Sequence, residues 1–228
     1  MPDTVLPELQ NNKVVGRLQQ YALPLAVAVL VIFHVVGFWG LGLSGRPAYF
    51  QSLTPLNLLL TNALLFGFHR GWTGRFLLFA AVVFAAGFLA EVLGVHTGLL
   101  FGNYIYGETL GTKLWEVPLL IGLNWLMLVY ATGNMVQKLP VHWLLKAIAG
   151  AILLVVIDYF LEPVAVTYDF WSWHADIIPL SNFIGWFGLS LLLHIWFQKM
   201  NFWKQNKMAP YVYFVQLLFF IALNLLLK

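Results

Sequence analysis

Seven apolar runs set the first limit on how this chain folds. They fall near residues 21–41, 54–68, 75–93, 118–137, 143–162, 182–198 and 209–227. A helix needs about 20 apolar residues to cross a bilayer, and most of the runs come close to that length. The runs at 54–68 and 182–198 are shorter. The pattern therefore predicts an all-α polytopic membrane protein with about seven transmembrane helices.

Composition agrees with the membrane class. Hydrophobic residues make up 61% of the 228 positions and charged residues only 9%, against about 25% charge in ordinary soluble domains. The chain has no cysteine, which excludes disulfides, thiol nucleophiles, iron–sulfur ligation and cysteine-based zinc sites. We expect a polar tail over 1–20, one transmembrane helical domain over 21–228, and multi-pass insertion in the cell membrane.

The basic residues predict the orientation. With a cytoplasmic N-terminus, nine of the twelve fall in inner segments: Lys13, Arg17, Arg70, Arg75, Lys138, Lys146, Lys199, Lys204 and Lys207. The outer segments hold Arg46, Lys113 and Lys228. Positive charge collects on the cytoplasmic side of membrane proteins, so this alternation favours seven crossings with the N-terminus inside. The net charge of +3 is spread and not clustered, so we expect no nucleic-acid partner.

Acidic residues gather on the opposite side. Seven of the nine lie in two outer loops or the helix ends beside them: Glu91, Glu108, Glu116, Asp158, Glu162, Asp169 and Asp176. The only base in the same loops is Lys113. Carboxyl groups near an apolar helix are unfavourable unless they are paired or used. We therefore expect most of them to be solvated, hydrogen-bonded or partly protonated.

The stretch 157–173, IDYFLEPVAVTYDFWSW, concentrates these features. Asp158 and Glu162 are four residues apart, which places both carboxyl groups on one face of a helix. Pro163 predicts that the helix ends there. An aromatic loop with Trp171 and Trp173 is expected to follow.

The other outer loop carries a similar set of residues. Glu91 lies near the predicted helix end, and Tyr104 and Tyr106 follow in the loop. Asn124 and Trp125 interrupt the next apolar run. Asn182 and Trp186 lie at the start of the predicted helix that follows the stretch 157–173. We expect the polar groups of both loops to meet at one mouth between the helices, with aromatic rings lining it.

Histidines give only a weak metal signal. His96 and His174 lie in the two outer loops, but the chain lacks the repeated His-x-x-His or His-x-x-x-His spacing of membrane di-iron enzymes. No dinucleotide or phosphate loop is present either. We therefore predict no metal and no cofactor, with His96 placed among the substrate-binding residues.

Acids, amides and aromatic rings without thiols or nucleotide loops suit two kinds of chemistry. A carboxylic acid kept neutral in an apolar site can protonate an alkene. The resulting cation is favoured by aromatic faces and a carboxylate, and water then adds to it. The same inventory suits proton translocation, so at this point both readings stay open.

Four blocks in order carry a family resemblance. They are Glu91-x-x-Gly94-x-x-Thr97-Gly98-x-x-Phe101-Gly102-x-Tyr104-x-Tyr106, Pro118 with Trp125, Asp158-x-x-x-Glu162-Pro163 with Trp171-x-Trp173, and Pro179-x-x-Asn182-Phe183-x-Gly185-Trp186. Over residues 75–195 the chain resembles the CruF-type carotenoid hydratases, which are integral-membrane carotenoid biosynthesis proteins. The resemblance implies addition of water across the terminal 1′,2′ double bond of an acyclic carotenoid end group, without a redox cofactor. This chain departs from the family pattern at Glu162, where Asp is more frequent, and at Ile178, where Gly is.

Chemistry, and not the family, gives the expected roles. Asp158 or Glu91 is the expected proton donor, Glu162 the base or cation stabiliser, and Asn124 and Asn182 the water holders. The expected substrate-binding residues are Tyr104, Tyr106, Trp125, Trp171, Trp173, Trp186 and His96. The expected partners are a carotenoid that enters from the bilayer, membrane lipids and other enzymes of carotenoid biosynthesis. The alternatives are a proton or solute transporter, and a metal-dependent carotenoid oxygenase or desaturase with His96 and His174 as ligands.

Overall fold

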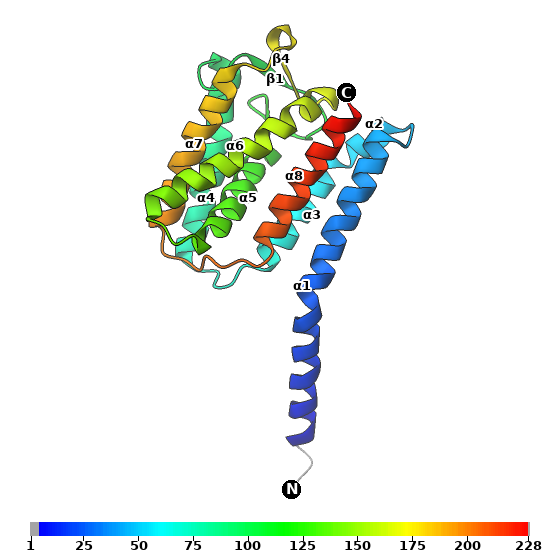
Figure 1. Ribbon diagram of the computed structural model, residues 1–228, viewed down its shortest axis with the longest axis vertical. Coiled ribbons are helices and arrows are strands. Elements are labelled where there is room, and N and C mark those ends of the chain that lie inside the picture. The colour runs from blue at the N-terminus through cyan, green and yellow to red at the C-terminus, as the bar shows by residue number, and fades with distance from the viewer. Residues whose placement is uncertain (1–4, 228) are drawn as a thin grey trace.

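A computed structural model describes the backbone of residues 5–227 and the side chains of residues 21–227 (Figure 1). Six long helices dominate it: α1 (Val5–Gly42), α4 (Gly74–Thr97), α5 (Leu119–Met135), α6 (Trp143–Thr167), α7 (Leu180–Lys199) and α8 (Ala209–Leu226). Two shorter helices, α2 (Pro47–Ser52) and α3 (Thr54–Gly67), connect α1 to α4. The all-α polytopic prediction is confirmed.

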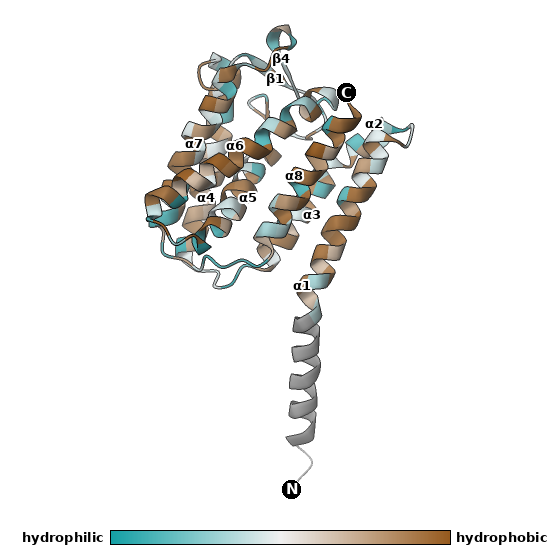
Figure 2. Ribbon diagram, in the orientation of Figure 1, coloured by the Kyte–Doolittle hydropathy of each residue, from teal (hydrophilic) through white to brown (hydrophobic). Residues whose placement is uncertain are grey.

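The predicted runs all appear as helices, and six of these are long and apolar enough to cross a membrane. Helix α3 has 14 residues, fewer than the length that a crossing usually needs. Helix α7, by contrast, has 20 residues, because it begins before the apolar run and ends after it. Hydrophobic residues cover the long helices (Figure 2), and many of their large side chains face outward, such as Leu77, Leu192 and Leu218. This is the surface of a membrane protein.

The connections fall at two ends of the bundle. The β-strands, α2 and the end of α8 lie at one end, and the α3–α4, α5–α6 and α7–α8 connections lie at the other (Figure 1). The second end carries Arg70, Lys138 and Lys204, as the charge alternation predicts. A cytoplasmic location for this end stays a prediction.

Helix α5 forms the centre of the core. It packs against α3, α4, α6, α7 and α8, and Trp125 and Tyr130 on it are fully buried. Gly87 on α4 allows the close approach of α4 to α5, because a Cβ there would lie 2.5 Å from the Trp125 side chain. Small residues let helix backbones approach in this way inside membranes. This contact fixes where the Trp125 indole lies.

Two short antiparallel strand pairs form between the helices. Strand β1 (Tyr104–Tyr106) pairs with β4 (Trp171–Trp173), and β2 (Lys113–Leu114) pairs with β3 (Val117–Pro118). Two 3₁₀ turns, Val136–Lys138 and His174–Asp176, follow α5 and β4. Strand β4 occupies the position where the sequence predicts an aromatic loop. Strands β1 and β4 come from segments that are far apart in the chain, so neither segment alone indicates a strand.

The prediction that the helix ends at Pro163 is wrong. Helix α6 continues through Pro163 to Thr167. Proline removes one backbone donor, but in transmembrane helices neighbouring groups and local adjustments compensate for this loss. Asp158 and Glu162 therefore lie well inside α6 and not at its last turn.

Candidate functional site

Asp158 and Glu162 share one hydrogen-bond donor. Both side chains are buried on α6, with 0% and 1% of their surface exposed. The Asn182 amide nitrogen on α7 donates to Asp158 Oδ2 at 3.0 Å and to Glu162 Oε1 at 2.7 Å. An amide has two hydrogens, so both are committed to carboxyl oxygens. Asn182 thus positions the acids, and its predicted role as a water holder stays a prediction.

The second oxygen of Glu162 meets two indoles. Trp173 Nε1 donates to Oε2 at 2.7 Å, and Trp171 Nε1 donates to the same atom at 3.1 Å. Glu162 therefore accepts three hydrogen bonds, all from neutral donors. Donors of this kind stabilise the ionised form of a carboxyl group.

Glu91 on α4 has an equivalent set of donors. The Tyr104 and Tyr106 hydroxyls donate to Oε2 at 2.6 and 2.8 Å. Trp125 Nε1 donates to Oε1 at 2.9 Å. Trp186 on α7 stacks on Trp125 with ring centroids 4.4 Å apart. Glu91 is thus enclosed by aromatic side chains from a strand and two helices.

The β1–β4 sheet supplies donors to both acids. Tyr104 is the register partner of Trp173, and Tyr106 is the partner of Trp171. All four side chains are buried, while the residues between them, Ile105 and Ser172, are exposed. Alternate residues of a strand point to opposite faces, so a single face of this sheet carries two phenols for Glu91 and two indoles for Glu162.

The tyrosine donors stay protonated over the ordinary pH range. Burial raises the pKa of Tyr104, and the nearby negative charge of Glu91 raises it further. The same two causes raise the pKa of Tyr106 well above its usual value. Both phenols therefore act as hydrogen-bond donors and not as bases.

No basic side chain reaches the three acids within residues 21–227. Lys113, the base expected to be nearest, pairs with the exposed Glu108 at 2.7 Å. Asp158 differs from the other two acids, because its Oδ1 is buried and has no hydrogen-bond partner in the described part of the chain. Neighbouring carboxyl groups without a counter-ion repel when both are ionised. A shared proton relieves that repulsion.

Asn124 and His96 do not join the acids, although the sequence places them among the site residues. Asn124 lines a neighbouring cavity. The His96 side chain is about half exposed, and its Nδ1 lies 3.7 Å from the exposed Glu116. A one-residue step along a helix turns the side chain by about 100°, which separates Asn124 from its neighbour Trp125.

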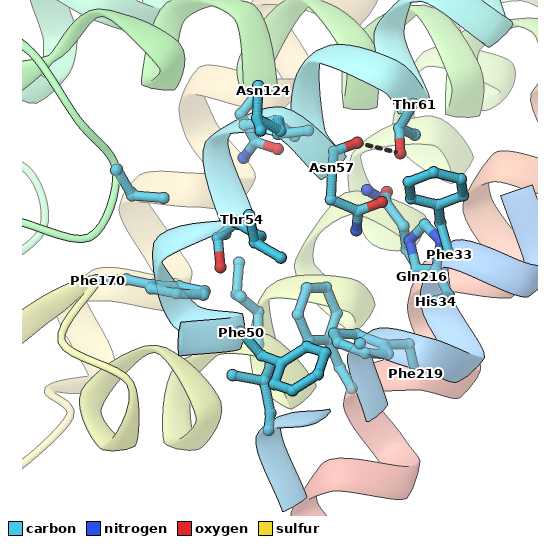
Figure 3. Close-up of a pocket in the computed structure, with 18 of the residues that line it drawn as sticks. Phe33, His34, Phe50, Thr54, Asn57, Thr61, Asn124, Phe170, Gln216 and Phe219 are labelled. Atoms are coloured by element: carbon cyan, nitrogen blue, oxygen red, sulfur yellow. Dashed lines mark hydrogen bonds between the residues drawn. The ribbon is translucent and has the colours of Figure 1, made fainter. Parts of the chain in front are cut away.

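The cavity that Asn124 lines has a volume of about 240 Å³. It lies among α1, α3, α5, α6 and α8, and most of its wall is apolar (Figure 3). Its polar lining residues are His34, Thr54, Asn57, Thr61, Asn124 and Gln216. Of these, only Asn124 was among the predicted site residues, because the others are isolated polar residues in apolar runs and His34 is typical of a packing histidine. The only sequence signal is the helical spacing of Thr54, Asn57 and Thr61.

Trp171 belongs to both sites. Its ring lines the cavity, and its Nε1 is bonded to Glu162. Ile157 and Leu161 on α6 also line the cavity, each one residue before an acid of the cluster. The acids and the cavity therefore lie on adjacent faces of α6, with the Trp171 indole between them.

Comparison with known proteins decides the family. The family model for carotenoid biosynthesis proteins matches residues 53–228. This chain belongs to the carotenoid biosynthesis protein family. The match covers more than three quarters of the chain and includes every member of the acid cluster and most of the cavity wall. No curated protein and no solved structure matches the chain.

For this carotenoid biosynthesis protein, the donor set gives no sign of a metal centre. Within the part of the chain that the structure describes, no group of three or more His, Asp or Glu side chains is arranged to hold a metal ion. His174 lies beside β4, where its backbone nitrogen donates to the Asn103 carbonyl at 2.9 Å. The chemistry on which the site can draw is that of carboxyl, amide, phenol and indole groups.

Proposed function

We propose that this member of the carotenoid biosynthesis family is a carotenoid hydratase. It adds water across the terminal 1′,2′ double bond of an acyclic carotenoid end group. A carboxylic acid gives its proton to C2′, and the π electrons form the new C–H bond, which leaves a tertiary cation at C1′. Water bonds to C1′ through its oxygen and releases a proton to a carboxylate. The product is a tertiary alcohol, and no electrons are exchanged with a cofactor.

The observation that carries this proposal is the cluster of three buried carboxyl groups without a base. Protonating an unactivated alkene needs a carboxylic acid in a site of low polarity. A cation then needs a negative charge and aromatic faces close by. Glu91, Asp158 and Glu162 supply the carboxyl groups, and the aromatic rings of the β1–β4 sheet surround two of them.

The hydrogen bonds distinguish the three acids. Glu91 and Glu162 each accept three donors, which favours their ionised forms. Asp158 accepts one donor and keeps one oxygen free. We therefore assign Asp158 as the proton donor. Glu162 stabilises the cation and takes up the proton that water releases, and Glu91 fixes the phenols of β1.

In the resting arrangement, the Trp171 ring separates the cavity from Glu162. An end group held in the cavity reaches the acids only when this ring moves. The proposed reaction therefore includes a displacement of the Trp171 side chain when the substrate binds.

Pigment analysis with labelled oxygen tests the reaction. The chain is expressed in a host that accumulates lycopene, an acyclic carotene. The pigments are separated by chromatography, and their masses are measured by mass spectrometry. A hydratase gives products heavier by one or two waters, with the hydroxyl oxygen taken from H₂¹⁸O. Oxygen from ¹⁸O₂ would instead support the oxygenase alternative. Unchanged pigments together with proton flux in liposomes would support the transporter alternative.

A further inference from the structure

The cavity among α1, α3, α5, α6 and α8 is large enough for a ligand. A dry cavity of about 150 Å³ holds benzene, and this cavity measures about 240 Å³. Trp171, Ile157 and Leu161, which border the acid cluster, form part of its wall. A ligand that fills the cavity therefore lies beside the acids.

The outer end of the cavity faces the bilayer. Phe33 and Val36 on α1 and Leu56 on α3 line it, yet each leaves about half or more of its side chain exposed, at 50%, 48% and 62%. The described part of α1 is mostly apolar along its length (Figure 2). An apolar molecule dissolved in the membrane can therefore enter sideways between α1 and α3.

Uncharged polar groups also line the cavity. Gln216 is 7% exposed, and its Oε1 is buried without a hydrogen-bond partner in the described part of the chain. Asn57 Oδ1 has the same status, and both side chains lie among the residues that line the cavity (Figure 3). Buried polar atoms in proteins nearly always have a partner. Two unsatisfied amide oxygens indicate a ligand group that donates a hydrogen bond.

An otherwise apolar ligand with one hydroxyl group suits the size of the cavity, its apolar entrance and its two unsatisfied amide oxygens. The hydroxyl donates to an amide oxygen and accepts from an amide nitrogen, while the rest of the molecule contacts the apolar wall. A charged headgroup does not fit, because none of the lining residues is an acid, a lysine or an arginine.

We propose that this cavity binds the end of an acyclic isoprenoid chain, and that Asn57 and Gln216 hold an oxygen beside that end. The oxygen is either the water to be added or the hydroxyl of the product. The ligand enters from the bilayer between α1 and α3 and ends at Trp171. The assignment of the oxygen rests on the proposed hydratase function, whereas the entry of an apolar chain does not.

Binding is measured without turnover. The Asp158→Asn protein is purified in detergent and incubated with lycopene or with a 1-hydroxylated acyclic carotenoid. Pigment that stays with the protein after gel filtration is quantified by absorbance. Because this assay needs no reaction, its outcome is independent of whether the hydratase proposal holds. β-Carotene, in which both ends are closed rings, is the negative control and should not stay with the protein.

Two substitutions block the cavity by different routes. Gly37→Leu adds a side chain inside it, and the new Cβ would lie 3.5 Å from Phe219, an ordinary contact. Leu56→Trp obstructs the entrance from an exposed position. Each should weaken lycopene binding about tenfold or more, because overpacking opposes the bound state. Gly188→Leu is the matched control, since a Cβ on that α7 glycine meets nothing within 4 Å.

A third substitution tests the oxygen site. Gln216→Met keeps the length of the side chain and removes its amide. It should weaken binding of the hydroxylated carotenoid about tenfold, because a buried hydrogen bond is lost, and affect lycopene much less. Lycopene binding by Gly37→Leu and Leu56→Trp equal to that of Gly188→Leu would overturn the binding site. Equal effects of Gln216→Met on both carotenoids would overturn the oxygen assignment.

Discussion

Tyr104 and Trp173 are cross-strand neighbours on one face of the β1–β4 sheet, with ring centroids 5.1 Å apart. The two side chains donate hydrogen bonds to different acids. The Tyr104 hydroxyl reaches Glu91, and the Trp173 indole reaches Glu162. Because the two rings touch, a change at one acid alters the packing beside the other. The sheet thus couples α4 to α6 through side chains that neither helix contributes.

Removing the phenol oxygen of Tyr104 tests this coupling. Tyr104→Phe keeps the ring and deletes the 2.6 Å hydrogen bond to Glu91. Hydrogen bonds to charged groups contribute about 1.5–3 kcal/mol, so product formation should fall about tenfold to a hundredfold. Ile105→Ala, at an exposed position on the same strand, is the control and should behave as wild type. Pigment yields of Tyr104→Phe equal to those of the control would show that this phenol has no role in the reaction.

Asn182 should matter for folding as well as for activity. Asn182→Leu leaves Asp158 and Glu162 without their common donor, and an unsatisfied buried polar group costs about 1–3 kcal/mol. We expect a lower melting temperature in detergent, followed by circular dichroism. Ile184→Ala on the outer face of α7 controls for loss of side-chain volume. Equal melting temperatures for the two variants would contradict the bridging role.

Two substitutions of Trp171 distinguish its role in the cavity wall from its hydrogen bond to Glu162. Trp171→Phe keeps an aromatic wall for the cavity but loses the 3.1 Å bond to Glu162. Trp171→Ala also removes the wall, and truncation of a buried aromatic side chain costs about 3–5 kcal/mol. The Phe variant should retain pigment binding and lose activity, whereas the Ala variant should lose both. Full activity in the Ala variant would contradict the position of this ring between cavity and acids.

Alkaline titration checks the environment of the two phenols. The raised pKa values of Tyr104 and Tyr106 mean that neither ionises as the pH approaches the ordinary tyrosine value of about 10. Their contribution to stability is complete below that value and is lost as the pH rises through the higher pKa of the folded state. The phenolate absorbance gained up to about pH 10.5 should therefore be the same for wild type and for the Tyr104→Phe, Tyr106→Phe double variant. A smaller gain in the double variant would show that the phenols are accessible.

The sequence was sufficient for the helices and for the acid pair. Hydrophobic runs identified every long helix, and the four-residue spacing placed Asp158 and Glu162 on one face. Their common donor, Asn182, was among the candidates. The clustering of the two acidic loops was also predicted, because charge alternation places both at the same end.

The remaining features depend on contacts between distant segments. Strands β1 and β4 are three residues each, too short to show a pattern, and exist because they pair with each other. Helix α6 continues past Pro163, which neighbouring groups in a membrane bundle allow. The cavity amides Asn57 and Gln216 are 159 positions apart in the chain and line one cavity only because α3 packs near α8. Local patterns carry no information about such pairs.

The most direct test of the hydratase account is the pigment profile of the Asp158→Asn variant in the lycopene-producing host. Asn has the shape of Asp but no acidic proton, so the variant retains packing and loses the proposed donor. Hydrated product should fall by about 10²–10³-fold, while Asp176→Asn, at an exposed acid near the same loop, should match wild type. Full hydration by Asp158→Asn at equal protein level would contradict the assignment of Asp158 as the proton donor.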